Sequence, residues 1–292
     1  MFFVLLFLII GGCTKKIPES NPPIVQGHRV SGVSQKPRKA LKHAQEKGYP
    51  SIEIDVSLTS DLVLIVHHDY WLDKTNCAEK TPVSHQTFIK NHTWKQLREK
   101  TTCLSSGDTT ILSVEEFLSS PLLSPQVLIN LDVKYHPQFT RSKERFVQAL
   151  VHLVSQYPNR KIMITASDLY LVQTLKKMLS VPVFIEYPFF SSTNRNHHDV
   201  MIALQAKIRM SLGITRIEEL VEQSNADGIS LPFQIVTLRD ARRLNERGMM
   251  IQLFTVHKRK DAQRLCSWPI DILISDIPES VPCFHAISAT PD

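Results

Sequence analysis

Two carboxylates share one face of a predicted strand. In residues 51–58, apolar side chains alternate with Glu53 and Asp55, and the two-residue period of a strand puts both carboxylates on the same side. Neighbouring carboxylates repel each other, so a buried pair needs a cation to be stable. Oxygen ligands with open positions suit Mg²⁺ or Ca²⁺, although an amphipathic strand with one solvated face has the same pattern.

A second segment repeats this pattern and adds a positive charge. Residues 128–134 alternate in the same way, with Asn130, Asp132 and Lys134 on one face. Asp132 could complete a set of three metal ligands. Lys134 would then offer its ammonium group to a phosphate oxygen.

Histidines end two further apolar runs. His28 and Arg29 follow one run, and His67 and His68, with Asp69 after them, follow another. An imidazole titrates near neutral pH, so two histidines can serve as general base and general acid. The guanidinium of Arg29 can bind a phosphate through two parallel hydrogen bonds. A single histidine at a strand end is more often structural, but four such segments together favour a functional site.

These segments belong to a series of short apolar runs that alternate with helix-length amphipathic segments. We expect strands at 24–29, 51–56, 127–134, 161–165, 181–186, 227–231, 250–256 and 271–275. We expect helices at 37–47, 143–156, 169–179, 217–223, 238–247 and 260–265. Eight strand–helix units in about 250 residues predict a single-domain α/β fold, the (β/α)8 TIM barrel, with an open doubly wound sheet as the alternative. The long connections 70–126 and 187–226 must hold additional elements or loops.

Composition limits the classes of protein that remain. The 292 residues are 42% hydrophobic, which excludes a disordered chain and a multi-span membrane protein. The formal net charge of +6 suits an anionic substrate or an anionic membrane surface but requires neither. With only nine glycines, a glycine-rich phosphate loop is not expected. Clusters of Lys and Arg fall on predicted outer helices and no nucleic-acid motif occurs, so we expect no nucleic-acid partner.

The order of the motifs resembles that of the glycerophosphodiester phosphodiesterase family. In the family, a His-Arg pair precedes Glu-x-Asp, His-Asp, a carboxylate-x-Lys strand and late Thr-Val-Asn and Thr-Asp-x-Pro segments. The matching positions are His28 and Arg29, Glu53 and Asp55, His68 and Asp69, Asp132 and Lys134, Thr255 to His257, and Ser275 to Pro278. The resemblance spans residues 25–278, nearly the whole chain after its N-terminal region.

The resemblance implies a TIM barrel and a role for each matched residue. The acid–base pair would be His28 and His68. One divalent cation, Mg²⁺ or Ca²⁺, would be bound by Glu53, Asp55 and Asp132. The phosphate would be bound by Arg29 and Lys134. The substrate would be a small-molecule phosphodiester, a deacylated phospholipid hydrolysed to glycerol 3-phosphate and an alcohol. Two alternatives are a phospholipase acting on intact lipid, sphingomyelinase D-like or phosphoinositide-specific, and a non-catalytic surface-binding lipoprotein on the same barrel.

The sequence departs from the family pattern at four matched positions. Val30 replaces the glycine after His-Arg, and Asp132 replaces a glutamate, which shortens that side chain by one methylene. Phe254 replaces a tryptophan, and His257 replaces an asparagine. We expect Val30 to narrow the pocket beside the phosphate, so the enzymatic activity of the family is expected here but its substrate choice does not carry over directly.

The N-terminal region has the features of a bacterial lipoprotein. We expect a signal peptide at residues 1–12, a tether at 13–23, the barrel at 24–282 and a C-terminal tail at 283–292. The apolar run 2–10 is too short to span a bilayer, and Gly11, Gly12 and Cys13 resemble a lipobox. Cys13 would then be lipidated and would anchor the exported protein to a membrane. Because no Lys or Arg precedes the run, a plain secretory signal is the alternative.

Export would place the other cysteines in an oxidising compartment. Three pairings of Cys77, Cys103, Cys266 and Cys283 are possible, and proximity in sequence favours Cys77 with Cys103 and Cys266 with Cys283. The sequence does not indicate an oligomeric state.

Overall fold

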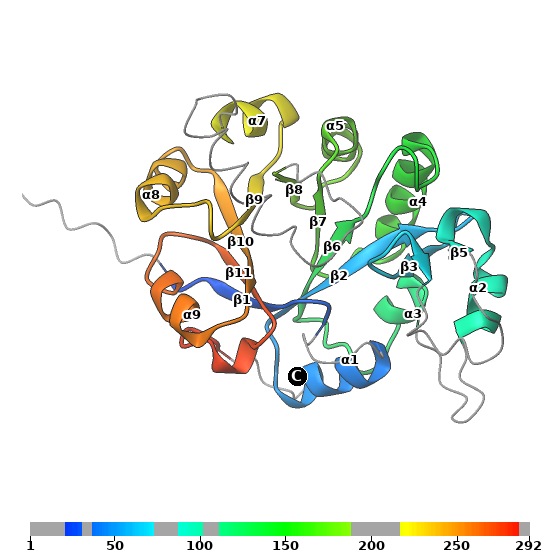
Figure 1. Ribbon diagram of the computed structural model, residues 1–292, viewed down its shortest axis with the longest axis horizontal. Coiled ribbons are helices and arrows are strands. Elements are labelled where there is room, and N and C mark those ends of the chain that lie inside the picture. Colours follow the sequence, from blue (N-terminus) through cyan, green and yellow to red (C-terminus); the bar gives the residue numbers. More distant parts are fainter. Residues whose placement is uncertain (1–20, 31–36, 73–86, 102–110, 188–216, 286–292) are drawn as a thin grey trace, which may run out of the picture.

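Eight parallel strands form a closed barrel (Figure 1). The computed structural model describes residues 21–30, 37–72, 87–101, 111–187 and 217–285. The barrel strands are β1 (Ile24–Gly27), β2 (Ser51–Leu58), β6 (Leu128–Val133), β7 (Ile162–Ala166), β8 (Val183–Glu186), β9 (Gly228–Pro232), β10 (Met250–Val256) and β11 (Ile272–Ser275). Each strand pairs with the next, and β1 pairs with both β11 and β2, which closes the ring. The predicted TIM barrel is therefore confirmed, and the open doubly wound sheet is wrong.

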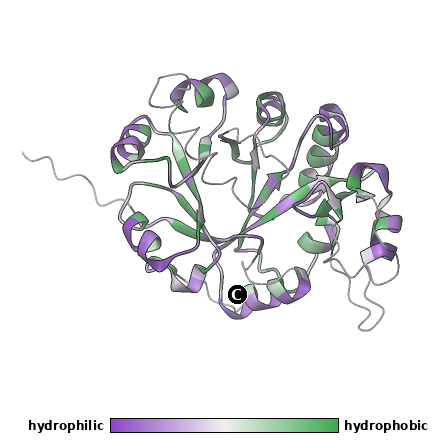
Figure 2. Ribbon diagram, viewed as in Figure 1, coloured by the Kyte–Doolittle hydropathy of each residue, from purple (hydrophilic) through white to green (hydrophobic). Residues whose placement is uncertain are grey.

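Helices surround the barrel and bury one face against it. They are α1 (Pro37–Glu46), α4 (Lys143–Gln156), α5 (Leu169–Met178), α7 (Ile217–Ser224), α8 (Leu238–Glu246) and α9 (Arg259–Leu265). Their apolar residues face the strands and their polar residues face outward (Figure 2). Ser142 and Asp168 cap α4 and α5, and Thr237 forms a capping box with Asp240 at the start of α8. All six predicted helices are present, because apolar periodicity marks each of these segments.

The connection between β2 and β6 holds additional elements, as the sequence predicted, and they form a small subdomain. It contains β3 (Leu64–Val66), β4 (Trp71–Leu72), β5 (Thr87–Phe88), η1 (Ile89–Asn91), α2 (Trp94–Thr101) and α3 (Val114–Leu118). The subdomain lies beside the barrel and has a small apolar core of its own (Figure 1). The second long connection ends in α7, and its residues 188–216 lie outside the described ranges.

Strand β3 carries the second histidine segment to the barrel. The first part of β2 pairs with β1, whereas Val56–Leu58 at its end pairs with the antiparallel β3. The His67 N–H then donates to the Asp55 carbonyl at 3.0 Å. The residues after β3 are thereby fixed beside the C-terminal end of β2, which is the end of a barrel strand that carries catalytic groups in this fold.

Side-chain amides fill the barrel interior beneath that end. Gln26 donates to Ser51 at 2.7 Å, and Asn130 donates to Gln26 at 3.1 Å and to Gln252 at 3.4 Å. Thr165 donates to Asn130 at 3.0 Å. These polar side chains are all buried and hydrogen-bonded to one another. They therefore form a stable polar layer in the barrel, beneath the strand ends that carry the charged residues.

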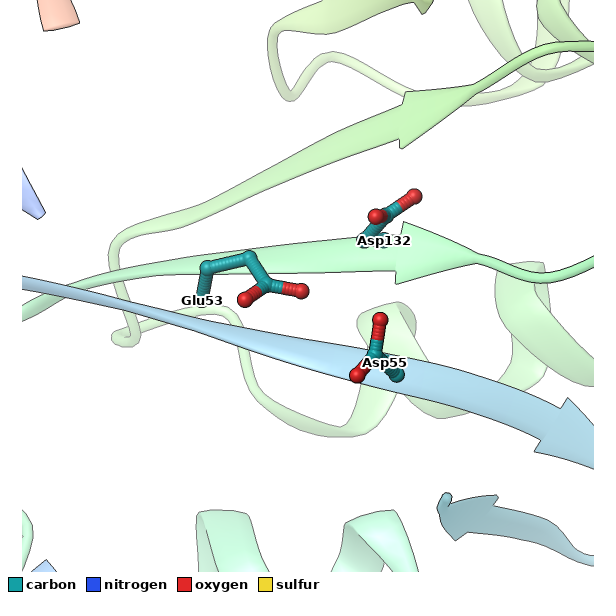
Figure 3. A group of neighbouring side chains, drawn as sticks. All are labelled: Glu53, Asp55 and Asp132. Carbon is teal, nitrogen blue, oxygen red and sulfur yellow. The ribbon is translucent and has the colours of Figure 1, made fainter. Parts of the chain in front are cut away.

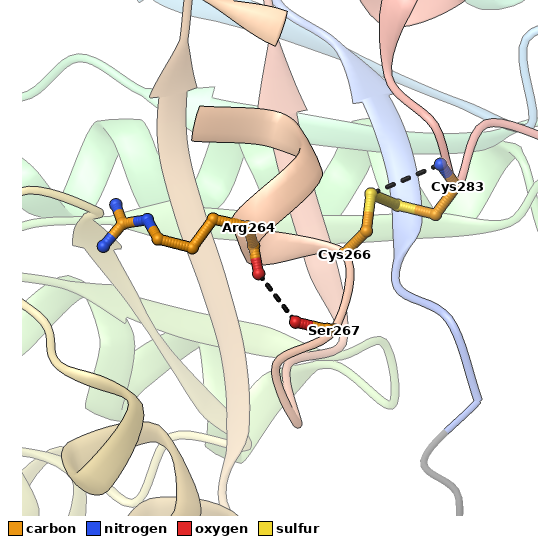
Figure 4. Close-up of a disulfide and its surroundings, with 4 residues drawn as sticks. All are labelled: Arg264, Cys266, Ser267 and Cys283. Carbon is orange, nitrogen blue, oxygen red and sulfur yellow. Dashed lines mark hydrogen bonds between the residues drawn. A yellow bond between two sulfur atoms is a disulfide. The ribbon is translucent and has the colours of Figure 1, made fainter. Parts of the chain in front are cut away.

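A disulfide links the end of α9 to residue 283, the first residue of the expected tail (Figure 4). The Cα atoms of Cys266 and Cys283 are 5.7 Å apart, so the predicted pairing of these two cysteines is confirmed. The other cysteines, Cys13, Cys77 and Cys103, lie outside the described residues. Within the described ranges, no helix is long and apolar enough to cross a membrane.

Candidate active site

Three carboxylates from two neighbouring strands meet at the barrel mouth (Figure 3). Glu53 and Asp55 lie on β2 and Asp132 lies on β6, where the parallel register pairs residue 55 with residue 132. One oxygen from each carboxylate lies within 4.8 Å of the others. Glu53 and Asp55 are buried, at 2% and 4% exposure. The structure therefore brings together the three residues that the sequence analysis assigned as metal ligands.

Each of these carboxylates has a buried oxygen that accepts no hydrogen bond from the described residues. The atoms are Glu53 Oε1, Asp55 Oδ1 and Asp132 Oδ1. Burying an unsatisfied polar atom is costly, and burying three charged ones together is more so. Hard divalent cations bind such carboxylate oxygens, so the trio fits a Mg²⁺ or Ca²⁺ site.

Two basic side chains lie against the same carboxylates. Lys134 Nζ is 2.5 Å from Asp132 Oδ2 and 3.1 Å from Asp55 Oδ1, the second contact lacking hydrogen-bond geometry. Arg29 Nε is 3.1 Å from Asp55 Oδ2, and the Arg29 backbone N–H donates to Glu53 Oε2 at 2.8 Å. Both residues expected to bind phosphate are thus next to the proposed metal ligands.

Burial and neighbouring charges shift the pKa values of Glu53, Asp55 and Lys134 in different directions. Burial, with the charges of Asp55 and Asp132, raises the pKa of Glu53 well above its usual value. Burial also acts to raise the pKa of Asp55, but nearby positive charges outweigh burial and lower that pKa. These charges are on Lys134, His68, Arg29 and His28. Burial acts to lower the pKa of Lys134, but Asp132 and Asp55 raise it well above the usual value, so Lys134 stays charged.

A tight turn after β1 positions Arg29. The strand ends at Gly27, two residues earlier than predicted, and Arg29 and Val30 adopt positive φ values of 47° and 73°. A Cβ atom on Gly27 would lie 2.2 Å from the Val30 carbonyl oxygen, so the turn requires glycine there. The Val30 side chain is 2% exposed and packs in the main core. The position of the Val30 side chain in the core does not support the expectation that it narrows the phosphate pocket, and Val30 has a left-handed backbone conformation that favours glycine.

The first histidine is held by a carboxylate from the last strand. His28 Nδ1 lies 2.5 Å from Oδ1 of Asp276, which follows β11. The other oxygen of Asp276 binds His257 Nδ1. Burial acts to raise the pKa of the Asp276 carboxyl, but its bonds to the two rings outweigh this and lower it.

The two adjacent histidines differ in their surroundings. His68 Nδ1 lies 2.7 Å from Asp69 Oδ1, and its side chain is 40% exposed. His67 Nε2 instead bonds the Trp71 carbonyl oxygen at 3.2 Å, and burial lowers the pKa of the His67 ring. His68 is therefore half exposed and bonded to a neighbouring carboxylate, whereas His67 is bonded to the backbone of its own loop. The catalytic role expected of His68 stays a prediction.

Comparison with known proteins identifies the family. The model of the glycerophosphoryl diester phosphodiesterase family matches residues 38–280. The chain belongs to this family. A curated glycerophosphodiester phosphodiesterase from Caldanaerobacter subterraneus subsp. tengcongensis is 22% identical over 254 residues, which are 83% of this chain and 88% of the relative. The chain is thus a phosphoric diester hydrolase, as the motifs predicted.

Solved structures have the same fold as this phosphodiesterase. An Oleispira antarctica phosphodiesterase in complex with the product sn-glycerol-3-phosphate is 17% identical, with a TM-score of 0.67 over 89% of this chain and 95% of that chain. A glycerophosphodiester phosphodiesterase from Parabacteroides distasonis is 17% identical, with a TM-score of 0.66 over 90% and 96%. At these identities, the likeness shows a shared barrel fold.

Three polar residues at the mouth of the phosphodiesterase barrel had no role in the predictions from sequence. Asp276 and His257 were noted only as family positions, and Glu186 only as the end of a strand. Burial and Asp132 raise the pKa of Glu186 to about 8, although Lys134 opposes them. Their positions in the sequence could have indicated a role, because polar residues end β8 and follow β10 and β11, at the end of the barrel where the active site is expected.

Proposed function

We propose that this phosphodiesterase hydrolyses glycerophosphodiesters, the deacylated forms of phospholipids, to glycerol 3-phosphate and an alcohol, with the help of one divalent cation. The observation that carries this proposal is the trio of carboxylates that each hold a buried, unsatisfied oxygen and that adjoin two basic side chains. The name of the curated relative and the product bound in the Oleispira structure support the class of substrate.

The cation would be held by Glu53, Asp55 and Asp132. Mg²⁺ and Ca²⁺ both prefer oxygen ligands and both fit this donor set. A cation bound there acts as a Lewis acid toward a phosphoryl oxygen.

Arg29 and Lys134 would bind the phosphate and stabilise the negative charge that builds on its oxygens. The left-handed turn fixes the backbone of Arg29, and two carboxylates hold the ammonium group of Lys134. Donors fixed in advance need no reorganisation when charge develops, which is why such groups contribute strongly to rate.

His28 and His68 would exchange protons with the substrate. One removes the proton from the attacking oxygen and the other protonates the departing alkoxide. They come from different elements, and the positive charge of each acts to lower the pKa of Asp55. In each ring a carboxylate binds Nδ1, which leaves Nε2 to face the reaction.

A substrate panel tests the proposed reaction. The purified protein is incubated with glycerophosphocholine, glycerophosphoethanolamine or micellar phospholipid. Release of glycerol 3-phosphate from the soluble diesters is followed by a coupled assay, and release of the head group from the phospholipid is followed in parallel. We expect turnover of the soluble diesters, and we expect the near-isosteric variant Glu53→Gln to lose it. Turnover of micellar lipid alone would contradict the proposal and favour a lipase.

We also propose that the enzyme is exported and anchored to a membrane through lipidated Cys13. The disulfide between Cys266 and Cys283 supports an oxidising compartment. Mass spectrometry of the N-terminal peptide from a bacterial host should find a lipid on Cys13, and Cys13→Ser should release the protein from the membrane fraction. An unmodified Cys13 in the membrane fraction would contradict the anchor.

A further inference from the structure

We propose that Asp276 positions His28 for proton transfer and that His257 regulates this pair by binding the second oxygen of the same carboxylate. The proposal deepens the proposed function, because it rests on the acid–base role given to His28. It adds a positioning residue, Asp276, and a titratable group, His257, to the site.

The carboxylate is fixed by the backbone of three strands. The Asp276 N–H donates to the Val256 carbonyl at the end of β10 at 3.1 Å. The preceding residue, Ser275, accepts from the His28 N–H through its carbonyl at 3.0 Å and donates its hydroxyl to Val256 at 2.9 Å. His28, Asp276 and the start of the loop after β10 therefore form one rigid unit across β1, β11 and β10.

The contact between Asp276 and His28 sets the tautomer of the ring. A carboxylate only accepts hydrogen bonds, so a neutral His28 that binds Asp276 through Nδ1 must carry its hydrogen on that nitrogen. The lone pair then lies on Nε2, where a proton can be exchanged with substrate. Without the carboxylate, the neutral ring is free to hold its hydrogen on Nε2 instead, and the nitrogen that must act as base would be blocked.

His257 Nδ1 binds Oδ2 of the carboxylate whose Oδ1 binds His28. The His257 side chain is 58% exposed, whereas those of His28 and Asp276 are 22% and 28% exposed. His257 can therefore exchange a proton with solvent while it remains bound to Asp276.

A proton on His257 changes what Asp276 can do for His28. Two cationic rings must then share one negative charge, so the His28 imidazolium is stabilised less than when His257 is neutral. Other charges near these groups include Arg29, which interacts electrostatically with Asp276, and Asp55, which interacts electrostatically with His28. Lys258 and Arg259, which follow His257 in the sequence, add positive charge on its own segment.

The pH dependence of turnover in two variants tests the proposal. Asp276→Asn keeps the shape of the side chain but removes its charge, and we expect kcat to fall about 10²-fold or more with little change in KM. The limb of the pH–rate profile set by His28 should move to lower pH in Asp276→Asn and to higher pH in His257→Asn. Movement in these opposite directions is the result that a purely structural role would not produce.

A matched control pair lies outside the barrel mouth. His43 Nε2 is 2.7 Å from Glu279 Oε1, and we expect Glu279→Gln to leave the pH–rate profile unchanged. If Asp276→Asn only lowered the melting temperature and kept the wild-type profile, the positioning role would be overturned. If the profile of His257→Asn coincided with that of the wild type, the regulatory role would be overturned.

Nuclear magnetic resonance separates this proposal from the proposed function. With ¹⁵N-labelled histidine, the His28 Nδ1–H proton should resonate at low field in the wild type and lose that shift in Asp276→Asn, whether or not a substrate is turned over. Titration of His257 should move the His28 signals. If these signals behave as expected while no glycerophosphodiester is hydrolysed, the proposed function fails and the carboxylate contact stands; absence of the low-field proton overturns the contact itself.

Discussion

Each histidine of the proposed acid–base pair is bound by a carboxylate, and this pairing sets expectations for single substitutions. His28 Nδ1 is 2.5 Å from Asp276, and His68 Nδ1 is 2.7 Å from Asp69. We expect His28→Ala and His68→Ala each to lower kcat about 10²-fold or more, because general acid–base catalysis contributes at least that much. Steady-state kinetics on a soluble glycerophosphodiester measures the effect.

His67 supplies the control for this prediction, since it comes from the same segment but bonds the Trp71 carbonyl. We expect His67→Gln to lower the melting temperature and to leave kcat close to that of the wild type. Equal losses of kcat in the variants of His67 and His68 would contradict the assignment.

At the level of residues, the sequence predicts which side chains lie together when they share a strand or lie on neighbouring strands. The carboxylates Glu53, Asp55 and Asp132 could be placed together because a strand has a two-residue period and the barrel sets neighbouring strands in register. The contact between His28 and Asp276 joins residues 248 positions apart, and no local pattern encodes it. The sequence also indicated Arg29 and Lys134 as basic residues of the site. Their ion pairs with Asp55 and Asp132 follow only from the three-dimensional arrangement.

At the level of elements, the turn after β1 depends on one glycine. A Cβ on Gly27 would lie 2.2 Å from the Val30 carbonyl oxygen and 2.8 Å from the Tyr49 ring. We expect Gly27→Ala to lower the free energy of unfolding by about 3 kcal/mol, the upper end of the usual cost of overpacking. Gly248→Ala is the control, because a Cβ there meets no atom within 4 Å and only its φ of +74° is unfavourable, at about 1 kcal/mol. Urea unfolding of both variants measures the difference, and equal losses would contradict the steric argument.

The junction of α1 with the C-terminal η2 (Pro278–Ser280) should weaken in acid. Burial acts to raise the pKa of the Glu279 carboxyl, but its backbone N–H, the Tyr49 hydroxyl and His43 outweigh this and lower it. A carboxyl whose pKa is lowered on folding stabilises the protein above its unfolded pKa of about 4.3, and this contribution is lost as pH falls through the lower, folded pKa. The difference in melting temperature between the wild type and Glu279→Gln should therefore be present at pH 7 and close below about pH 4. A difference independent of pH would contradict this.

The elements themselves were largely predictable, since apolar alternation marks the eight barrel strands and amphipathic periodicity marks the outer helices. The short strands β4 and β5 were missed because two residues carry no periodicity of their own. The end of β1 was placed too late because Arg29 and Val30 continue a β-rich run, yet the turn forces both residues into left-handed backbone.

At the level of the whole molecule, the disulfide fastens the end of the chain to the barrel. It joins residues 17 positions apart, and a loop of that size is worth about 3 kcal/mol in the chain-entropy view. We expect Cys266→Ser with Cys283→Ser to lower the free energy of unfolding by about 2–4 kcal/mol and to leave kcat unchanged, since the bond lies outside the proposed site. Denaturant unfolding with and without reductant measures this. A loss of kcat at temperatures where the variant is fully folded would contradict a purely structural role.

The proposed reaction depends on one divalent cation bound by the carboxylates of Glu53, Asp55 and Asp132. The most direct measurement is a titration of Mg²⁺ and of Ca²⁺ into chelator-treated enzyme, with binding followed by calorimetry and turnover followed in parallel. We predict that the treated enzyme is inactive, that one equivalent of cation restores turnover, and that Asp132→Asn weakens or abolishes both. Full turnover by enzyme shown to contain no metal would contradict the account.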